Sequence, residues 1–222
     1  MITTQFDHFV VNGHPKFLVF VSYFDATRAS NATLDSDFQY IRNKQIDGIR
    51  IFPNWLDWGT PPVPASDTLM DNDGNLRPAR LRRLKEVLIK AKQYGLLVDI
   101  SFTCDTVPGM TFNEYRSAMI AATNELSGDG YRHTFFDLQN ERMILSCGGL
   151  GVPMPASEIN DLRAAVENAD PMRLVTASDG PSESSSVALA HNTQQDIIAF
   201  HDLRTSTWYS DTGTVVANFA HP

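Results

Sequence analysis

Cysteine is scarce in this 222-residue sequence, which contains only Cys104 and Cys147. Two cysteines are too few for a framework of several disulfides or for a zinc site built mainly from thiolates. The six histidines show no paired ligand spacing such as HxH or HExxH. A metal-dependent hydrolase would need clustered histidine and carboxylate ligands, so we expect neither a metal nor another cofactor.

Long apolar segments are missing as well. The chain has no run of about eighteen apolar residues, which is the length that a membrane-spanning helix needs. The N-terminus, MITTQFDHFVV, lacks the basic start and the long apolar stretch of a secretory signal peptide. We therefore expect no membrane partner, and these segments leave the compartment open.

Positive charge is also in short supply, with 18 Lys and Arg against 26 Asp and Glu and a net charge of -8. Nucleic-acid binding depends on clustered Lys and Arg, so this balance argues against a nucleic-acid partner. The densest basic segment, 77–85, lies on an expected helix whose other face is apolar. We interpret it as a solvated helix face. The oligomeric state stays open.

What the sequence does contain is an alternation of short apolar segments with amphipathic ones. Near-continuous apolar strands are typical of a parallel sheet that is covered on both faces. We expect strands at 17–21, 46–52, 96–102, 134–138, 174–177 and 196–200. Between them, apolar residues at helical spacing predict helices at 37–43, 81–91, 112–126, 159–166 and 182–191.

Repeated strand–helix alternation has two standard solutions, a (β/α)8 barrel and a doubly wound open sheet. No glycine-rich phosphate loop follows the first strand, which disfavours a nucleotide-binding open sheet. We therefore predict an α/β fold, a (β/α)8 TIM barrel, as one domain over 1–222. Such a barrel typically has about 250 residues. With about six β/α units visible, we expect a C-terminal truncation that removes strands seven and eight, or else a naturally shortened relative.

The fourth expected strand ends in Asn140 and Glu141. Active sites of barrel enzymes are built at the carboxyl ends of the strands. In a sugar hydrolase a carboxylic acid at this place can protonate the glycosidic oxygen, and a neighbouring amide can hydrogen bond the sugar 2-hydroxyl. An isolated Asn–Glu pair is more often a simple strand-to-loop transition, so the interpretation depends on the other motifs.

Those motifs occur in a fixed order along the chain. An Asn12–Gly13 turn leads into the first strand, Arg50 lies on the second, the Asn–Glu pair follows the fourth, and His201 follows the sixth. This ordered set resembles the clan A glycoside hydrolases, especially family 5 and its cellulase-like and mannanase-like members. The resemblance extends over essentially the whole chain, and it implies a (β/α)8 barrel that hydrolyses β-glycosides with retention of configuration.

The resemblance assigns four catalytic positions. Glu141 matches the general acid/base, and Asn140 matches its partner at the sugar 2-hydroxyl. Arg50 matches the arginine that supports the nucleophile carboxylate, with an ion pair inside the barrel as the alternative. His201 matches an active-site histidine after strand six, with a loop histidine as the alternative.

Further residues are candidates for substrate binding. The loop 53–78 is long and rich in Trp, Pro, Asp and Gly, and long ordered loops are often functional. Its Trp55 and Trp58 offer aromatic faces to sugar rings, or else pack the loop onto the barrel. The other candidates at expected strand ends are Tyr23, Asp179 and Arg204, with Asp105 as a weaker one.

A retaining mechanism needs a second carboxylate about 5–5.5 Å from the first. The resemblance implies a Glu at the end of strand seven, but the last Glu in this sequence is Glu183. We therefore expect a retaining glycoside hydrolase for a β-linked oligo- or polysaccharide whose nucleophile is absent from these residues, so that this chain is inactive as given. The alternatives are a carbohydrate-binding pseudoenzyme and, third, a metal-dependent barrel hydrolase.

Two smaller expectations complete the sequence-based interpretation. Family resemblance favours an extracellular or periplasmic location. Cys104 and Cys147 both follow neighbouring expected strands, so a disulfide between the two loops is a hypothesis that the structure can test.

Overall fold

The computed structural model describes residues 1–5, 8–55, 64–107, 109–179 and 194–199. Its centre is a sheet of five parallel strands, and the order of the strands across this sheet is the same as their order along the chain. The strands are β4 (Phe20–Ser22), β5 (Gly48–Ile51), β6 (Leu97–Ser101), β7 (Thr134–Asp137) and β10 (Val175–Thr176). A doubly wound sheet reverses its strand order at a switch point, whereas this order runs in one direction only. The expected (β/α)-barrel class is confirmed.

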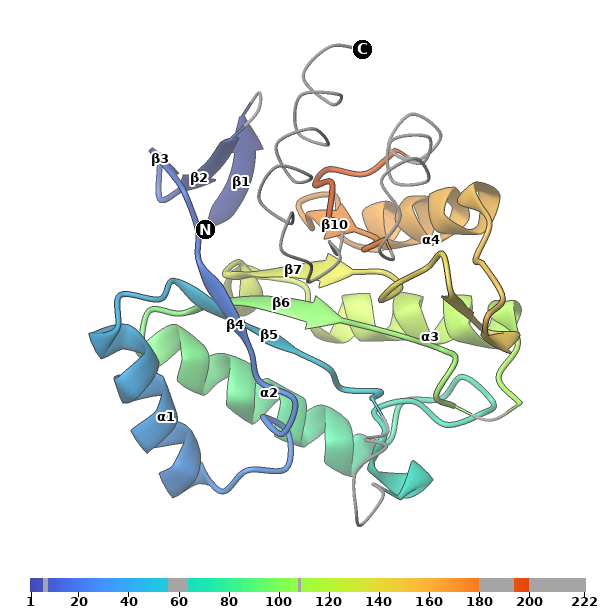
Figure 1. The fold of residues 1–222 in the computed structure, drawn as a ribbon, viewed down its shortest axis with the longest axis horizontal. Coiled ribbons are helices and arrows are strands. Elements are labelled where there is room, and N and C mark those ends of the chain that lie inside the picture. Colours follow the sequence, from blue (N-terminus) through green and yellow to red (C-terminus); the bar gives the residue numbers. More distant parts are fainter. Residues whose placement is uncertain (6–7, 56–63, 108, 180–193, 200–222) are drawn as a thin grey trace, which may run out of the picture.

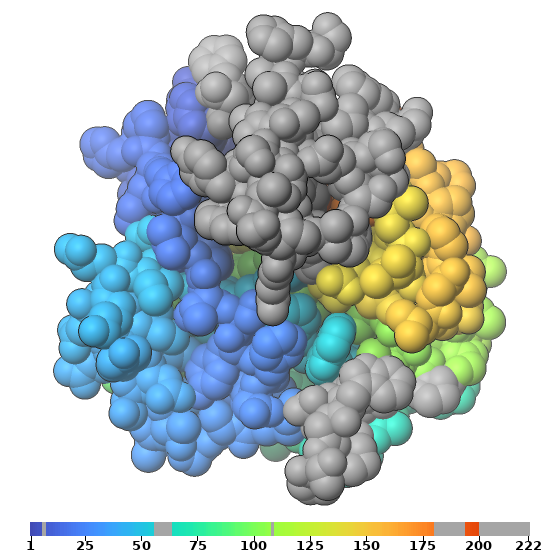
Figure 2. All heavy atoms as spheres, in the orientation of Figure 1, coloured from blue at the N-terminus to red at the C-terminus, as the bar shows by residue number. Residues whose placement is uncertain are grey.

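Four helices connect these strands and lie on the outer side of the curved sheet (Figure 1). They are α1 (Asn31–Asn43), α2 (Pro78–Gln93), α3 (Phe112–Glu125) and α4 (Ala156–Ala169). Shorter elements are η1 (Ala65–Asp67), η2 (Asp129–Tyr131), β8 (Leu145–Ser146) and β9 (Gly149–Leu150). In the space-filling view the segment around α1, in light blue, and α4, in orange, lie on opposite flanks of the molecule (Figure 2). None of the helices in the described ranges has the length and apolar character to cross a membrane.

Some expected boundaries need correction. The first strand begins at Phe20 and not at Phe17, whose side chain is 87% exposed in the connection from the preceding hairpin. The first helix begins at Asn31, because the Ser30 hydroxyl accepts a hydrogen bond from the Thr33 amide and caps it. Of the expected sixth strand, residues 196–199 are described and have no regular strand geometry. The expected helix at 182–191 lies outside the described residues.

A small antiparallel sheet precedes the barrel strands. It consists of β1 (Ile2–Gln5), β2 (His8–Val11) and β3 (His14–Lys16). Asn12 and Gly13 both have positive φ, at 52° and 86°, and form the two-residue turn between β2 and β3. Ile2 packs against Leu97 and Phe135, the inward-facing residues at the amino ends of β6 and β7. The small sheet therefore closes the amino end of the barrel strands.

Side chains alternate along each barrel strand. On β6, Val98 and Ile100 point outward into the main core with the helices, whereas Asp99 and Ser101 face the interior. The same two-residue period on β5 places Ile49 and Ile51 outside and Arg50 inside. The apolar face of the sheet thus anchors the helices, and its inner face is free to carry polar groups.

Candidate active site

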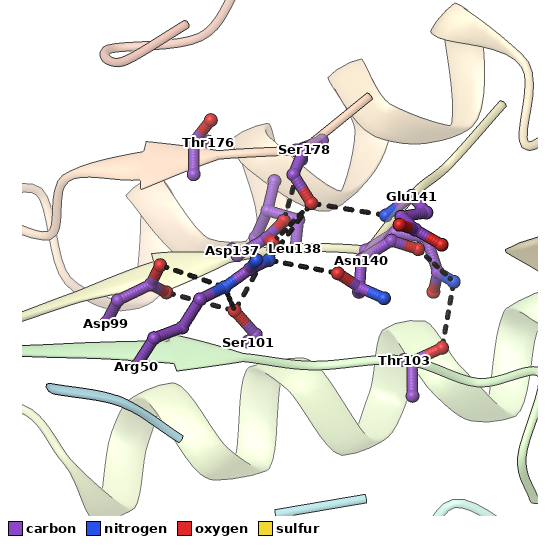
Figure 3. Close-up of polar contacts among 12 residues, drawn as sticks. Arg50, Asp99, Ser101, Thr103, Asp137, Leu138, Asn140, Glu141, Thr176 and Ser178 are labelled. Atoms are coloured by element: carbon purple, nitrogen blue, oxygen red, sulfur yellow. Dashed lines mark hydrogen bonds and ion pairs between the residues drawn. The ribbon is translucent and has the colours of Figure 1, made fainter. Parts of the chain in front are cut away.

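A network of polar contacts centred on Arg50 lies on the inner face of the sheet (Figure 3). Its Nε donates to Ser101 Oγ at 2.6 Å. Its Nη2 lies 2.5 Å from Asp137 Oδ2, 3.0 Å from Asn140 Oδ1 and 3.1 Å from Ser178 Oγ. One guanidinium therefore joins the carboxyl halves of β5, β6 and β7 and the residues that follow β10.

Two aspartates compensate this arginine. Asp137 is fully buried, and its carboxylate accepts hydrogen bonds from the amide and the hydroxyl of Ser178 at 2.8 and 2.7 Å. Asp99 Oδ2 lies 3.3 Å from Arg50 Nε. Burial raises the pKa of Asp99, the charge of Asp137 raises it further, and Arg50 opposes both. The ion pair inside the barrel, which was the alternative for Arg50, is present, and its expected role beside a nucleophile stays a prediction.

Asn140 and Glu141 leave β7 at the carboxyl end of the sheet, next to this network. The main-chain amide of Asn140 donates to the Phe102 carbonyl at 2.9 Å, and this bond ties Asn140 to the end of β6. The Glu141 amide donates to Ser178 Oγ at 3.1 Å, the same hydroxyl that accepts from Arg50. Glu141 is half-buried and has a φ of 47°, a left-handed conformation that is uncommon for a glutamate. The structure thus brings Arg50, Asn140 and Glu141 together at one end of the strands.

The loops after β6 and β7 are joined to each other. Gln139 Oε1 accepts from the Cys104 amide at 3.2 Å, and Gln139 Nε2 donates to Thr103 Oγ1 at 2.9 Å. Cys104 and Cys147 form a disulfide with a Cα–Cα distance of 4.9 Å. The hypothesis of a disulfide between these loops is confirmed. The chain is therefore fastened on both sides of Glu141.

Asp105 is a second carboxyl group at this edge. It is half-buried, and its side chain accepts hydrogen bonds from Thr103 Oγ1 and from Gln139. Burial raises the pKa of Asp105 to about 6, and the nearby charge of Glu141 contributes in the same direction. The charge of Glu141 thus acts on the pKa of Asp105, the weaker of the cleft candidates.

Other candidates for substrate binding lie apart from this network. The Tyr23 hydroxyl donates to Asp37 of α1 at 2.5 Å, and its ring packs on Phe38, so Tyr23 faces the helix layer. This placement differs from the expected position in the cleft. The reason is that the main chain of Tyr23 continues the β4 ladder by donating to the Arg50 carbonyl, with its side chain on the outer face.

Asp179 is also placed differently from a simple cleft residue. It is buried and lies 3.9 Å from the guanidinium of Arg142, which is itself buried. Arg142 donates to the Met154 carbonyl at 3.0 Å, so the pair ties the β7 loop to the β10 end. The ion pair accounts for the carboxylate of Asp179, and its role in substrate binding stays a prediction.

Trp55 packs against Phe52 and Phe24, with ring centroids 5.7 and 6.1 Å away. This is the packing alternative of the sequence-based interpretation, although Phe24 remains 45% exposed beside it. Trp58, His201 and Arg204 lie outside the described residues, so their roles remain predictions. Among the residues that are described, no three or more His, Cys, Asp or Glu side chains form a group that could hold a metal ion.

Sequence reasoning missed the acidic and hydroxyl partners of Arg50. These are Asp99, Ser101, Asp137 and Ser178. A signal for them exists, because Asp and Ser stand at alternate positions in strands that are otherwise apolar. A polar residue on the inner side of such a strand needs a partner, and Arg50 is the cation that the same layer offers.

Comparisons with known proteins support the fold. No protein-family profile matches the chain, and no curated protein is significantly similar in sequence. A solved glycoside hydrolase family 5 enzyme from Prevotella bryantii superposes with a TM-score of 0.63 at 14% identity, covering 92% of this chain and 72% of that one. Endo-1,4-β-mannanases from Eisenia fetida and Rhizomucor miehei give TM-scores of 0.58 at 15% and 10% identity.

The two mannanases are matched over 89% and 80% of this chain, and over 70% and 60% of their own chains. The chain thus spans between three fifths and three quarters of the length of these three neighbours. At such low identity the likeness shows the fold alone. The fold resembles that of these glycoside hydrolases, in agreement with the expected (β/α) barrel, and membership of family 5 stays a prediction.

Proposed function

We propose that this (β/α) barrel is a retaining glycoside hydrolase that cleaves O-glycosidic bonds of a β-linked oligo- or polysaccharide. The observation that carries the proposal is the placement of Asn140 and Glu141 at the carboxyl end of the fourth parallel strand, linked to Arg50 through the Ser178 hydroxyl. Active sites of barrel enzymes lie at this end of the strands. The mannanase-like fold supports a β-linked substrate.

In this proposal Glu141 protonates the leaving glycosidic oxygen and later activates water. Asn140 binds the sugar 2-hydroxyl, a contact that strengthens in the transition state. Because Asn140 Oδ1 accepts from Arg50, its amide NH2 group is the side that can donate to the sugar. Arg50 thus orients the amide in addition to compensating Asp137.

Double displacement also requires a nucleophile. We assign it, by resemblance, to a Glu at the end of a seventh strand, which is not among these residues since the last Glu is Glu183. The proposal therefore predicts sugar binding but no turnover by the 222-residue chain. The remaining expected contributors, His201, Arg204 and Trp58, would complete the cleft.

A direct test compares this chain with one extended by the codons that follow it in frame. Mannohexaose and cellohexaose serve as probes, with calorimetry for binding and NMR for the anomeric form of the product. We expect the extended chain to hydrolyse one of them with retention, and Glu141→Gln to lower kcat by a factor of about 10²–10⁴. Glu86→Gln, an exposed position on α2 paired with Arg83, is the matched control and should keep full activity.

Other outcomes have defined meanings. Inversion of the anomeric centre, or full activity in Glu141→Gln, would refute the proposal. Sugar binding without hydrolysis by the extended chain, or a stop codon directly after 222, would favour the carbohydrate-binding pseudoenzyme. Stabilisation by zinc or manganese would revive the metal-dependent alternative.

The disulfide supports the proposed location. Disulfides persist mainly in secreted and periplasmic proteins, where no thiol pool reduces them. The bond between Cys104 and Cys147 therefore supports an extracellular or periplasmic enzyme.

A further inference from the structure

A cavity of about 380 Å³ lies at the amino end of the barrel strands, where Asp47 precedes β5. Its walls come from the small sheet, which contributes Lys16, and from the last turns of α1 and α2, which contribute Arg42 and Lys92. His133, the residue before β7, is a further lining residue. A volume of this size is in the range of small-molecule sites, and the cavity is at the end of the strands opposite to the candidate active site.

The charges that line this cavity do not balance. Asp47 carries the only carboxylate among the described residues of the lining, and it forms an ion pair with Lys16 at 2.5 Å. Lys92 donates to the main-chain carbonyl of Asp129 at 3.0 Å, which leaves its charge uncompensated. Arg42 has no carboxylate partner in the described part of the chain. Two positive charges therefore remain at this cavity, in a protein whose net charge is -8.

The positions of these two cations have a second explanation that needs to be weighed. A cation in the last turn of a helix offsets the partial negative charge of the helix end. This effect alone does not account for the pattern, because α3 and α4 have no basic residue in their last turns. The two helices that have such residues, α1 and α2, both end at the cavity. The cations therefore go with the cavity and not with helix ends in general.

His133 adds a hydrogen-bond acceptor to these cations. It is 7% exposed, and its Nε2 lies 2.9 Å from the Leu88 carbonyl. A carbonyl can only accept, so Nε2 carries the hydrogen, and burial keeps the ring neutral by lowering the pKa of His133 to about 4. Nδ1 is then a lone pair without a hydrogen-bond partner among the described residues. A buried acceptor without a donor is costly, so an occupant that brings an O–H group gains affinity.

We propose that this cavity binds a small oxyanion that carries its own hydroxyl group. Arg42 and Lys92 bind its negative charge, and its hydroxyl donates to Nδ1 of His133. Monohydrogen phosphate has both features, and so have sugar acids, in which a carboxylate stands on a hydroxylated ring. Sulfate has the charge and the tetrahedral shape of monohydrogen phosphate but no hydrogen to donate. The cavity therefore distinguishes two anions that differ by one hydrogen, and this property is independent of the proposed sugar hydrolysis.

The test is calorimetric titration of the 222-residue chain with phosphate and with sulfate at equal ionic strength. At about pH 8 both anions carry close to two negative charges, but only phosphate keeps a hydrogen. We expect phosphate to bind about tenfold more tightly than sulfate, because only phosphate satisfies Nδ1 of His133. Phosphate should also shift the Nδ1 resonance of His133 in a nitrogen NMR spectrum more strongly than sulfate does. Equal affinities, or no binding of either anion at about 10 mM, overturn the proposal.

Two variants locate the site through its cations. Arg42→Gln and Lys92→Gln change exposed side chains, so the fold should persist, and each should weaken phosphate binding about tenfold. The matched control is Arg82→Gln, which removes the same charge from an exposed position on α2 outside the cavity and should keep the affinity. Equal losses in all three variants would show a general effect of net charge and refute the site.

A third variant separates selectivity from charge. His133→Phe should lower the affinity for phosphate to that for sulfate and leave sulfate binding unchanged. A folded His133→Phe protein that still prefers phosphate contradicts the role of Nδ1. If this variant does not fold, the selectivity of the unmodified chain and the two cation variants decide the proposal.

Glucuronate distinguishes the two sources of the ligand. Tighter binding of phosphate assigns the cavity to the free ion, whereas tighter binding of glucuronate assigns it to an acidic sugar, and both outcomes support the proposed chemistry. Failure of this inference is also distinguishable from failure of the proposed function. Glu141→Gln, at the other end of the strands, should leave anion binding unchanged even where it abolishes hydrolysis by an extended chain.

Discussion

The two ends of the same five strands differ in what they bury. At the amino end, Leu97 and Phe135 meet Ile2 of the small sheet, and the Phe20 ring occupies the space where Gly48 has no Cβ. At the carboxyl end, the same interior holds Arg50 and Asp137 in an ion pair. At the amino end, burial of apolar surface stabilises the fold. At the carboxyl end, burial of two charged side chains carries a desolvation cost that their attraction must offset.

The buried ion pair marks the carboxyl end as the place where a functional site is expected. A buried ion pair is weak evidence for stability, because hydrophobic residues of similar volume often serve at least as well. A fold that keeps one at the carboxyl end of its strands, next to Asn140 and Glu141, departs from the most stable packing where a site is expected. Substitutions that perturb the two ends separately test this difference.

The largest effect is expected at the ion pair. Arg50→Met leaves Asp137 buried without a cation, and we expect a loss of about 3–5 kcal/mol in the free energy of unfolding, measured by urea denaturation. Adding Asp137→Asn should recover most of the loss, because the uncompensated charge is then gone. Arg82→Met, an exposed position on α2, should change stability by less than about 0.5 kcal/mol. A loss in Arg50→Met no larger than in the control would contradict the comparison.

A smaller effect is expected from the disulfide at the same end. The bond closes a loop between residues 43 apart in sequence. Replacing both Cys104 and Cys147 by Ala should lower the free energy of unfolding by about 2–4 kcal/mol. Chemical reduction of the unmodified chain should lower its denaturation midpoint to a similar extent. An unchanged midpoint in both experiments would show that the loops need no covalent link.

A pH-dependent effect, small per unit of pH, is expected at the amino end. His133 precedes β7, its Nε2 contacts the Leu88 carbonyl at 2.9 Å, and burial lowers its pKa from 6.5 to about 4. The folded state therefore holds His133 neutral. Its contribution is fully present above pH 6.5 and is lost as the pH falls toward 4, with a slope of up to about 1.4 kcal/mol per pH unit.

The measurement for His133 is urea denaturation at several pH values between 7 and 4. His133→Asn should flatten the acid side of the stability curve, whereas His14→Asn, an exposed position on β3, should not. At the carboxyl end, Asp105 has the opposite sign. Its folded-state pKa is raised, so its contribution declines as the pH rises from about 4 to 6. If the free energy of unfolding falls equally steeply with acid in the unmodified chain and in His133→Asn, His133 is not the cause of the acid slope.

Much of the fold was predictable, because the apolar strands and the helices between them carry strong periodicity. Leu84, Leu88 and Ala91 are buried on α2 as their helical spacing predicts. The first strand was misplaced because Phe17 and Leu18 extend the apolar run into the preceding connection, where no partner strand covers Phe17 among the described residues. Where the strand begins depends on which of these residues is buried, and a run of apolar residues does not show this.

The site was predictable in part. The order of the motifs predicted that Arg50, Asn140 and Glu141 lie at the same end of the strands, because parallel strands place their carboxyl ends side by side. The structure has them there, and their roles stay predictions. Tyr23 was misplaced because being at the end of a strand does not say which face a side chain takes. That depends on the register of the pairing, in which each single-residue step turns a side chain from the interior to the helices.

Glu141 stands where a glycine would cost the main chain less, since positive φ suits a residue without a Cβ. Selection for heat tolerance alone would therefore tend to accept changes at 141 that relax the turn and discard the carboxyl group. A stabilisation campaign on this barrel should hold that position constant, and screen for sugar chemistry alongside thermal survival.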